Sequence, residues 1–207
     1  MPQIDFDGAN SLVKTDKIQG QSGTTVTVPT GHTVAITDAD RLTIAGTAVK
    51  AGALGMYASI AIIADQKAYD ADGGTFTNGA WRTRDLNTEI SDVDGIVSIS
   101  SNQFILQAGT YSIQWSAPAH SLGRHLTRLY NVTDTSVTQY GSAAYTGGAD
   151  VETHAVGEAV TTIGAQKTFS IQHRSQNTTA DNGLGIEFTT DSAAVSIYTI
   201  VKILKHA

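Results

Sequence analysis

The sequence predicts an all-β protein, and three observations support this prediction. Thr, Ser, Val, Ile, Gly and Ala are abundant, whereas the helix-forming residues Glu, Lys and Leu are sparse. Short segments in which apolar and polar residues alternate recur along the chain, and turn-forming Gly, Asn and Asp separate them. We find no window with a convincing helical period, so strands and turns are expected throughout.

Composition and charge exclude several classes of protein. The 207 residues suffice for one domain with its own core and a short appendage. The absence of cysteine excludes disulfides and thiolate metal sites, and fits assembly in a reducing compartment. The formal net charge of −6, with 13 basic residues scattered along the chain, argues against a nucleic-acid-binding surface. We expect no secretory signal and no membrane insertion, because the longest apolar stretch (51–64) is too short to span a bilayer.

The chain begins with a polar, glycine-containing arm over residues 1–24, which would be ordered only where it docks. Three units of eight residues follow, at 25–32, 33–40 and 41–48. Each unit predicts a short strand with apolar residues at positions i and i+2, followed by a polar turn. The two apolar columns consist of Val26, Val34 and Leu42, and of Val28, Ile36 and Ile44.

Such short strands bury little apolar surface by themselves. We therefore expect both columns to be covered by copies of the chain around a symmetry axis, or by another protein. The alternative is that the units are edge strands of a larger domain. Small residues around 48–54 predict a junction, which gives an attachment and repeat segment at 1–50 and a second domain at 51–207.

The second domain shows many short strands separated by Gly, Asn and Asp turns. Its expected strands are 58–63, 81–86, 96–99, 103–106, 109–115, 125–130, 137–140, 156–163, 167–173, 185–188 and 195–203. Alternation directs Tyr111, Ile113 and Trp115 inward, and likewise Phe169 and Ile171. Eight or more strands with long connections predict a Greek-key sandwich, of which the jelly roll is the common form.

Four segments of this domain, at 104–115, 128–134, 167–174 and 197–203, resemble the tumour-necrosis-factor and complement-like jelly roll. The likeness is to the version found in phage fibre and virion-surface proteins in particular. The N-terminal segment also resembles leader segments of structural proteins from marine phages. The chain lacks the collagen-like stalk and the cysteines of the animal branch, which argues against a cytokine or complement role.

This resemblance implies a homotrimer whose arm attaches to a phage particle while the jelly roll faces outward. The expected function is that of a non-enzymatic capsid decoration or cement protein, or a short head fibre. It would be assembled in the bacterial cytoplasm and bound to the major capsid protein or another virion protein. The alternative is a tail-fibre module that recognises a host glycan or protein, and a third hypothesis is a hydrolase of surface polysaccharide.

Asp70 and Asp72 are weak candidates for calcium binding, as is the turn after Asp92, because carboxylates stand beside glycine. No segment has the complete ligand spacing, and turns use Asp and Gly without an ion. We therefore predict no metal site. The histidines show no zinc-binding pattern, so we expect His120, His125, His154 and His173 to face solvent or to form hydrogen bonds between protomers.

No catalytic motif is evident. The chain lacks a nucleophile elbow, a distinct Ser, His and Asp combination, and a phosphate-binding glycine loop. We therefore expect no catalytic residues and no cofactor, although paired carboxylates for glycoside hydrolysis remain open.

Aromatic residues suggest a binding surface instead. Trp81, Tyr140 and Tyr145 are candidates for a ligand-facing loop, centred on 140–150, that would stack against sugar rings. Trp115 and Tyr111 are expected in the core or at the trimer axis, because they follow the strict alternation of their strand.

Overall fold

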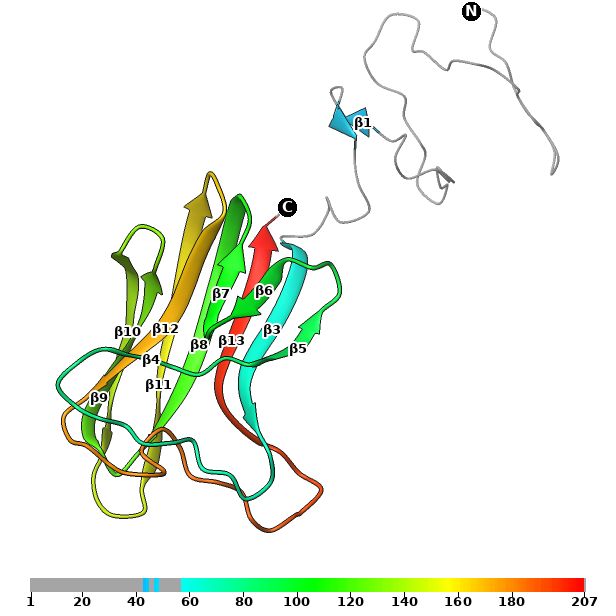
Figure 1. The fold of residues 1–207 in the computed structure, drawn as a ribbon. Coiled ribbons are helices and arrows are strands. Elements are labelled where there is room, and N and C mark those ends of the chain that lie inside the picture. The colour runs from blue at the N-terminus through cyan, green and yellow to red at the C-terminus, as the bar shows by residue number, and fades with distance from the viewer. Residues whose placement is uncertain (1–42, 45–46, 49–56, 207) are drawn as a thin grey trace, which may run out of the picture. The chain divides into compact units, whose positions relative to one another are not determined.

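The structure is a computed structural model that describes residues 43–44, 47–48 and 57–206 (Figure 1). The chain divides into two compact units, Met1–Val49 and Lys50–Ala207. In the first unit, β1 (Thr43–Ile44) and β2 (Thr47–Ala48) form an antiparallel pair. The eight-residue repeat predicted a turn where β2 lies, and this prediction was wrong. Two residues between β1 and β2 are enough to connect the strands of a hairpin. The predicted columns Val26, Val28, Val34, Ile36 and Leu42 lie outside the described residues, as does the side chain of Ile44.

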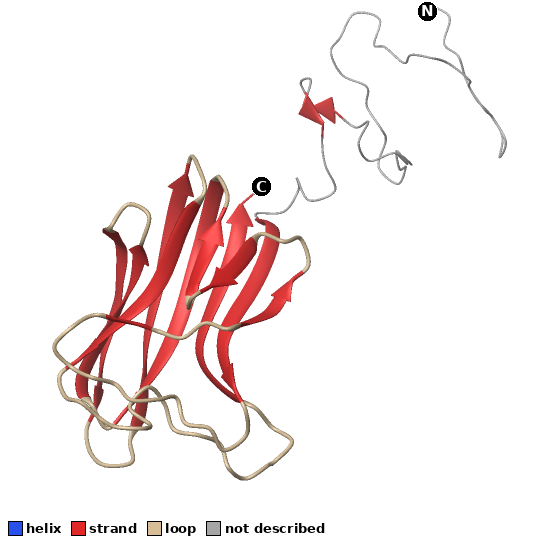
Figure 2. Ribbon diagram, in the orientation of Figure 1, coloured by secondary structure: helices blue, strands red, loops and turns tan. Residues whose placement is uncertain are grey.

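The second unit is a sandwich of two antiparallel sheets, and its described residues contain no helix (Figure 2). Its strands are β3 (Tyr57–Lys67), β4 (Arg82–Thr83), β5 (Thr88–Asp92), β6 (Val97–Ser100), β7 (Gln103–Leu106), β8 (Gly109–His120), β9 (Gly123–Asn131), β10 (Ser136–Thr146), β11 (Glu152–Ile163), β12 (Lys167–Ser175) and β13 (Ser196–His206). The first sheet, here the β10 sheet, has the order β10-β9-β12-β7-β6, with β4 paired to β12. The second, the β11 sheet, has the order β11-β8-β13-β3-β5. From β7 onward the chain passes repeatedly from one sheet to the other, which is the jelly-roll arrangement that the sequence predicted.

The core lies between the sheets and follows the predicted alternation. Tyr111, Ile113 and Trp115 on β8 are buried, and so are Phe169 and Ile171 on β12. Every second side chain of a strand points to the same face, so these residues meet between the two layers. Full burial of a side chain of this size contributes roughly 1.5–3 kcal/mol to stability. The prediction that these residues form the core is confirmed.

The expected strand 81–86 shortens to the two residues of β4, and Arg84, which follows β4, is buried. Its side chain is completely buried, and its guanidinium donates hydrogen bonds to Thr199 Oγ1 (2.7 Å), to the Pro118 carbonyl (3.2 Å) and to the Leu184 carbonyl (2.6 Å). Burial lowers the pKa of Arg84 to about 10, so the group stays charged at neutral pH. One side chain thus ties the segment after β4 to β8 and β13 of the other sheet and to the loop between β12 and β13.

The segment 185–188 was expected to be a strand, and this was wrong. It belongs to the loop between β12 and β13, and Gly185 has a φ of 140° there. A Cβ on Gly185 would lie 2.2 Å from the Tyr198 ring, so the backbone runs close over that ring. The Gly185 carbonyl accepts from Gly73 N (2.9 Å), and Ile186 N donates to Glu152 Oε2 (2.8 Å). These bonds go to loop and edge groups instead of to a neighbouring strand. The strand β5 had not been expected.

The long loops gather at one end of the sandwich, and the start of β3 and the end of β13 lie at the other (Figure 1). At the loop end, Phe76 pairs with Thr179, and Phe76, Ala119 and Leu122 form a second small core. At the opposite end, Tyr57 of β3 pairs with His206 of β13, and the centres of their rings lie 5.2 Å apart.

Candidate functional site

The outer surface of the β10 sheet carries the most distinctive cluster of side chains. Alternation along β9 points Arg124, Leu126, Arg128 and Tyr130 outward, while His125, Thr127 and Leu129 are buried. Strand pairing places further side chains beside these residues. On β10, Tyr140 lies opposite Arg128 and Tyr145 lies opposite Arg124. On β12, Arg174 lies opposite Leu126. We call this surface the β10 face, and its members are Trp81, Arg124, Leu126, Arg128, Tyr140, Ala143, Tyr145 and Arg174.

Arg128 organises one half of the β10 face. Its guanidinium carbon lies 4.1 Å from the centre of the Trp81 ring and 4.8 Å from that of Tyr130. Its Nε and Nη2 both donate to Gln172 Oε1, at 2.8 and 2.6 Å. Arginine over an aromatic ring is a favourable cation–π arrangement. Trp81, which precedes β4, is therefore held in place by a group on β9.

The structure brings Trp81 and Tyr140 together, with ring centres 6.0 Å apart. Tyr145 lies further along β10 and is 59% exposed, with the guanidinium carbon of Arg124 at 5.7 Å from its ring centre. The prediction that Tyr140 and Tyr145 belong to a loop was wrong, because both lie within β10. Both nevertheless are exposed on the predicted aromatic surface.

A β-bulge explains how two tyrosines five residues apart share a face. Between the pairs Tyr140↔Arg128 and Ala143↔Leu126, β10 advances three residues while β9 advances two. This extra residue reverses the alternation of the strand. Gly141 makes the bulge possible, since a Cβ there would lie 2.6 Å from Thr127 Oγ1 and from the Val156 carbonyl oxygen.

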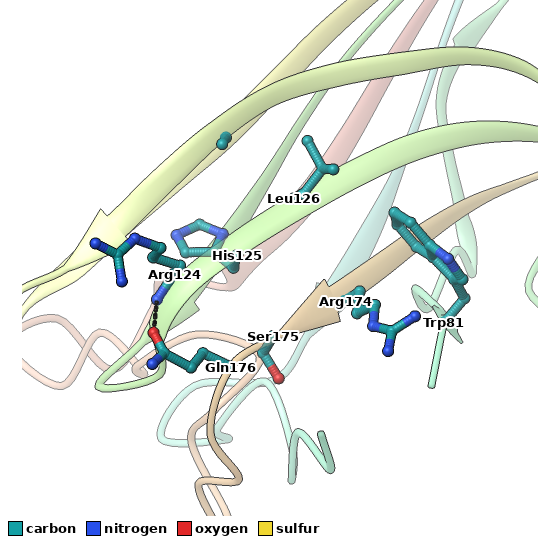
Figure 3. A pocket seen from close by; sticks show the side chains of 8 residues that line it. Trp81, Arg124, His125, Leu126, Arg174, Ser175 and Gln176 are labelled. Atoms are coloured by element: carbon teal, nitrogen blue, oxygen red, sulfur yellow. Dashed lines mark hydrogen bonds between the residues drawn. The ribbon is translucent and has the colours of Figure 1, made fainter. Parts of the chain in front are cut away.

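A cavity of about 410 Å³ opens on the β10 face (Figure 3). It is lined by Trp81, Arg124, His125, Leu126, Ala143, Arg174, Ser175 and Gln176. Gln176 closes one part of it, because its Oε1 accepts from Arg124 N at 3.2 Å and its own N donates to the Arg124 carbonyl at 2.8 Å. The lining contains two arginines and no carboxylate. Basic residues that are scattered in the sequence therefore gather here, through the pairing of β9 with β12.

The outer surface of the β11 sheet is chemically different. Its strand β8, next to the edge strand β11, presents the polar residues Ser112, Gln114 and Ser116, which pair with Val160, Glu158 and Val156 of β11. Across β13 the same rows continue to Ile200, and to Ile60 of β3. Val156, Val160, Ile60 and Ile200 are exposed, and Val160 is 65% exposed. We call this surface, formed by Ile60, Ser112, Ser116, Val156, Val160 and Ile200, the β11 face.

The expectation that the histidines face solvent was wrong for His120, His125 and His173, which are buried. Alternation turns His125 inward between Arg124 and Leu126, where its Nδ1 lies 2.9 Å from His173 Nε2. Burial lowers the pKa of His125 to about 4 and the pKa of His173 well below its usual value. Both rings are therefore neutral at pH 7. His154 does lie exposed on β11.

The two weak calcium candidates do not form a common site with a third ligand. Among residues 57–206, no group of three or more His, Cys, Asp or Glu side chains is placed to hold a metal ion. Burial, together with the nearby Glu187 carboxylate, raises the pKa of Asp72 to about 6, while Asp70 occupies a turn with a φ of 59°. Asp92 caps its own turn by accepting from Ile96 N (2.9 Å) and Val97 N (3.0 Å).

No helix in the described part of the chain is long and apolar enough to cross a membrane.

Comparison with known proteins gives similarities to solved structures alone. No protein-family profile matches the chain, and no curated protein matches it. The globular domain of zebrafish complement 1qA protein is similar with 17% identity and a TM-score of 0.40, covering 70% of this chain and 95% of that one. Murine APRIL at pH 8.0 is similar with 6% identity and a TM-score of 0.43, covering 71% and 98%. APRIL at pH 5.0 gives 7% identity and 0.44, with the same coverage.

At such identities and scores these similarities carry no inference about ligands or partners. The fold is established by the order and pairing of the strands themselves. The described domain of residues 57–206 is an all-β jelly-roll sandwich.

Proposed function

We propose that the protein is a non-enzymatic structural and binding module of a phage virion surface, and that it works as a homotrimer. The observation that carries the proposal is the contrast between the two outer faces of the sandwich. The β11 face offers exposed apolar side chains suited to self-association. The β10 face offers aromatic and cationic side chains suited to a ligand. The assignment to a virion rests on the resemblance of the N-terminal segment to leader segments of phage structural proteins.

The β11 face supports association between copies. Val156 and Val160 stand on the edge strand β11, and Ile200 and Ile60 lie nearer the middle of the same sheet. The serines of β8 between them leave room for another surface to approach closely. A contact between the edge of one copy and the sheet of the next is heterologous, and such contacts close into a ring when the rotation permits. We propose that three copies form this ring.

Sedimentation velocity of the full chain tests the trimer. The expected species has three times the 21.7 kDa mass of one chain. Val160→Lys should shift it toward the monomer, because each interface would then bury an unpaired charge. Ser136→Lys, which adds the same charge at an exposed position of β10, is the matched control and should leave the trimer intact. A monomeric parent chain, or a Val160→Lys variant that sediments as the parent does, would contradict the proposal.

We further propose that residues 1–50 attach the trimer to the major capsid protein or another virion protein, as a decoration protein or short head fibre. Three weak arm contacts held together act at high effective concentration, which makes attachment durable. The test is deletion of residues 1–50 followed by incubation with particles. The truncated chain should stay folded and fail to bind, and electron microscopy of the parent should label the particle surface. Retained binding after the deletion would disprove the attachment role.

A receptor-binding module is the second candidate function, and the β10 face is the observation that favours it. The Trp81 ring lines a preformed cavity, and exposed Tyr140 lies beside that ring, with the ring centres 6.0 Å apart. Glycoside hydrolysis by two carboxylates finds no site in that cavity, because no carboxylate lines it.

A further inference from the structure

We infer that the cavity beside Trp81 binds an acidic polysaccharide, one whose sugar rings carry carboxylate groups. This inference rests on the receptor-binding function and names the class of ligand. Its basis is the combination, in one cavity, of two guanidinium groups that form no ion pair among the described residues, an indole ring and an apolar floor.

The two guanidinium groups are the anion-binding part. Arg124 and Arg174 are both exposed and both line the cavity, one on β9 and one on β12. Within residues 57–206, neither arginine forms an ion pair with a carboxylate; the ion pairs found there involve Lys67, His154 and Lys167. A guanidinium presents a planar fork of N–H donors that matches a carboxylate in a bidentate arrangement.

The floor and one wall of the cavity suit the flat, less polar face of a sugar ring. Leu126 and Ala143 stand opposite each other on β9 and β10, and Leu126 also stands opposite Arg174 on β12. Trp81 supplies the aromatic wall. Its ring is already fixed by the guanidinium of Arg128 at 4.1 Å, so stacking a ligand on it requires little ordering.

The backbone around the cavity is also fixed in advance. Arg124 and Gln176 exchange two hydrogen bonds, from Arg124 N to Gln176 Oε1 and from Gln176 N to the Arg124 carbonyl. Ser175 Oγ donates to the Asn177 carbonyl at 2.9 Å. The strands that present the arginines are paired along their length. A preformed site loses little conformational entropy when a ligand binds.

The spacing of charge favours a polysaccharide over a nucleic acid. A nucleic acid carries a phosphate at every nucleotide and requires a continuous basic track. Here two arginines flank an apolar floor, and the chain as a whole is acidic. A cavity of about 410 Å³ also falls in the size range of small-ligand sites, which is roughly 300–1,000 Å³. We therefore assign sugar carboxylates as the groups recognised by Arg124 and Arg174.

The test is calorimetric titration of the full chain with matched pairs of oligosaccharides. The acidic members are oligomers of galacturonate, glucuronate, mannuronate and sialic acid; the neutral partners are oligomers of galactose, glucose and mannose of equal length, and oligothymidylate serves as the nucleic-acid arm. At least one acidic oligomer should bind, and at least about tenfold more tightly than every neutral one, since hydrogen bonds between charged groups are the strong ones. Its affinity should fall as salt concentration rises.

Variants locate the site. Arg174→Gln and Trp81→Ala should each weaken binding of the acidic oligomer about tenfold or more, and Trp81→Phe should retain part of it. Arg82→Gln is the matched control, since it removes the same charge from a neighbouring exposed position outside the cavity lining. Unchanged circular dichroism and thermal midpoint would show that each variant is folded.

Three results would overturn the inference: no acidic oligomer binding above its neutral partner, tighter binding of oligothymidylate, or full binding by the folded Arg174→Gln variant. These failures are distinguishable from failure of the trimer. Sedimentation of Arg174→Gln should match that of the parent, and Val160→Lys should still bind the acidic oligomer. Neutral glycan binding that survives at the same cavity would support the receptor module without the acidic specificity.

Discussion

The two outer faces of the sandwich share the same strand geometry but carry different side chains. Aromatic and cationic residues mark the β10 face, and exposed aliphatic residues mark the β11 face. On β9 the outward positions are occupied by large groups, Arg124, Leu126 and Arg128. On β8 the corresponding outward positions hold Ser112, Gln114 and Ser116. Alternation determines which residues reach a surface, and side-chain size then determines its relief. The β10 face has a cavity beside Trp81, and the β11 face has a smaller hollow lined in part by Ser116, Ile200 and Lys202, with exposed valines on its edge strand β11.

In the function proposed above, one sheet of the jelly roll binds a ligand and the other sheet associates with copies of the chain. A flat apolar surface gains most from close contact over a large area, as between copies of a protein. A hollow with few well-placed polar groups gains most from a small ligand. Both outer faces depend on the core between the sheets. A substitution in that core should therefore have the largest effect on the two faces.

Arg84→Met should have the largest effect, because it loosens both faces together. The substitution removes one buried charge and leaves the Thr199 hydroxyl and two carbonyl groups without their donor. We expect the free energy of unfolding to fall by about 3 kcal/mol or more. Chemical denaturation measures it. Arg84→Lys, which keeps the charge, should lose less, and a Met variant as stable as the parent would refute the structural role of Arg84.

Gly157→Ala should have the second-largest effect on stability. Gly157 lies on β11, the edge strand of the β11 sheet. A Cβ at Gly157 would lie 2.0 Å from a carbon of the Trp115 ring, whose Nε1 donates to Thr127 Oγ1 at 2.9 Å. The ring must move, so we expect a loss of about 2 kcal/mol, in the range of overpacked cores. Gly148→Ala has nothing within 4 Å and is the matched control, which should stay within about 0.5 kcal/mol of the parent. Equal stability of the two variants in thermal unfolding would contradict the close packing at Trp115.

Lowering the pH should reduce the stability of the fold, because it protonates His125, which is buried beneath the β10 face. The pKa of His125 is lowered to about 4 in the folded chain, so the unfolded chain takes up protons first. The stability contributed by the neutral ring is present above pH 6.5 and is lost as pH falls toward 4. Urea unfolding at pH 7 and pH 4.5 should show a loss on the order of 2 kcal/mol from this residue. His125→Gln should show a smaller loss between the same two pH values.

Asp72 should change the stability with pH in the opposite direction to His125, because its pKa is raised and not lowered. Its pKa is raised to about 6, so its contribution is fully present below pH 3.8 and is lost as pH rises through 6. Asp72→Asn should therefore steepen the loss of stability on acidification. If neither variant changes the pH dependence, the titrating groups lie elsewhere.

Arg128→Gln should have the smallest effect and should be confined to the β10 face. It removes the cation from between Trp81 and Tyr130 and the paired bonds to Gln172. Because the cluster is near the surface, we expect a loss of about 1 kcal/mol. Tryptophan fluorescence should change, because Trp81 loses its support, while sedimentation should not change. An altered oligomeric state would show that the two faces are coupled.

The core was predictable from sequence because strand alternation is a local pattern. Residues 103–106 were expected as a strand and coincide with β7, and the inward direction of Tyr111 and Trp115 was correct. The buried Arg84 was not predictable, because the acceptors of its guanidinium come from Pro118, Leu184 and Thr199, all distant in sequence. Charge in a core is costly unless such partners are present, and local sequence does not reveal them.

The candidate site was predicted only in its aromatic part. Trp81, Tyr140 and Tyr145 stood out by residue type, but the shared face of the two tyrosines depended on the bulge at Gly141. That glycine, inside an alternating segment, was the available signal. The gathering of Arg124 and Arg174 depends on which strands pair, and the sequence does not state the pairing of β9 with β12.

The pairing of Tyr57 with His206 has a consequence for any use of this domain as a scaffold. The chain enters and leaves the sandwich at one pole, while the loops that carry Phe76, Leu122 and Thr179 close the other. A passenger peptide joined after the last strand would therefore emerge beside the point where the leading segment departs. The loops at the far pole lie at the opposite end of the strands, so a sequence grafted there would be separated from both strand ends by the length of the sandwich.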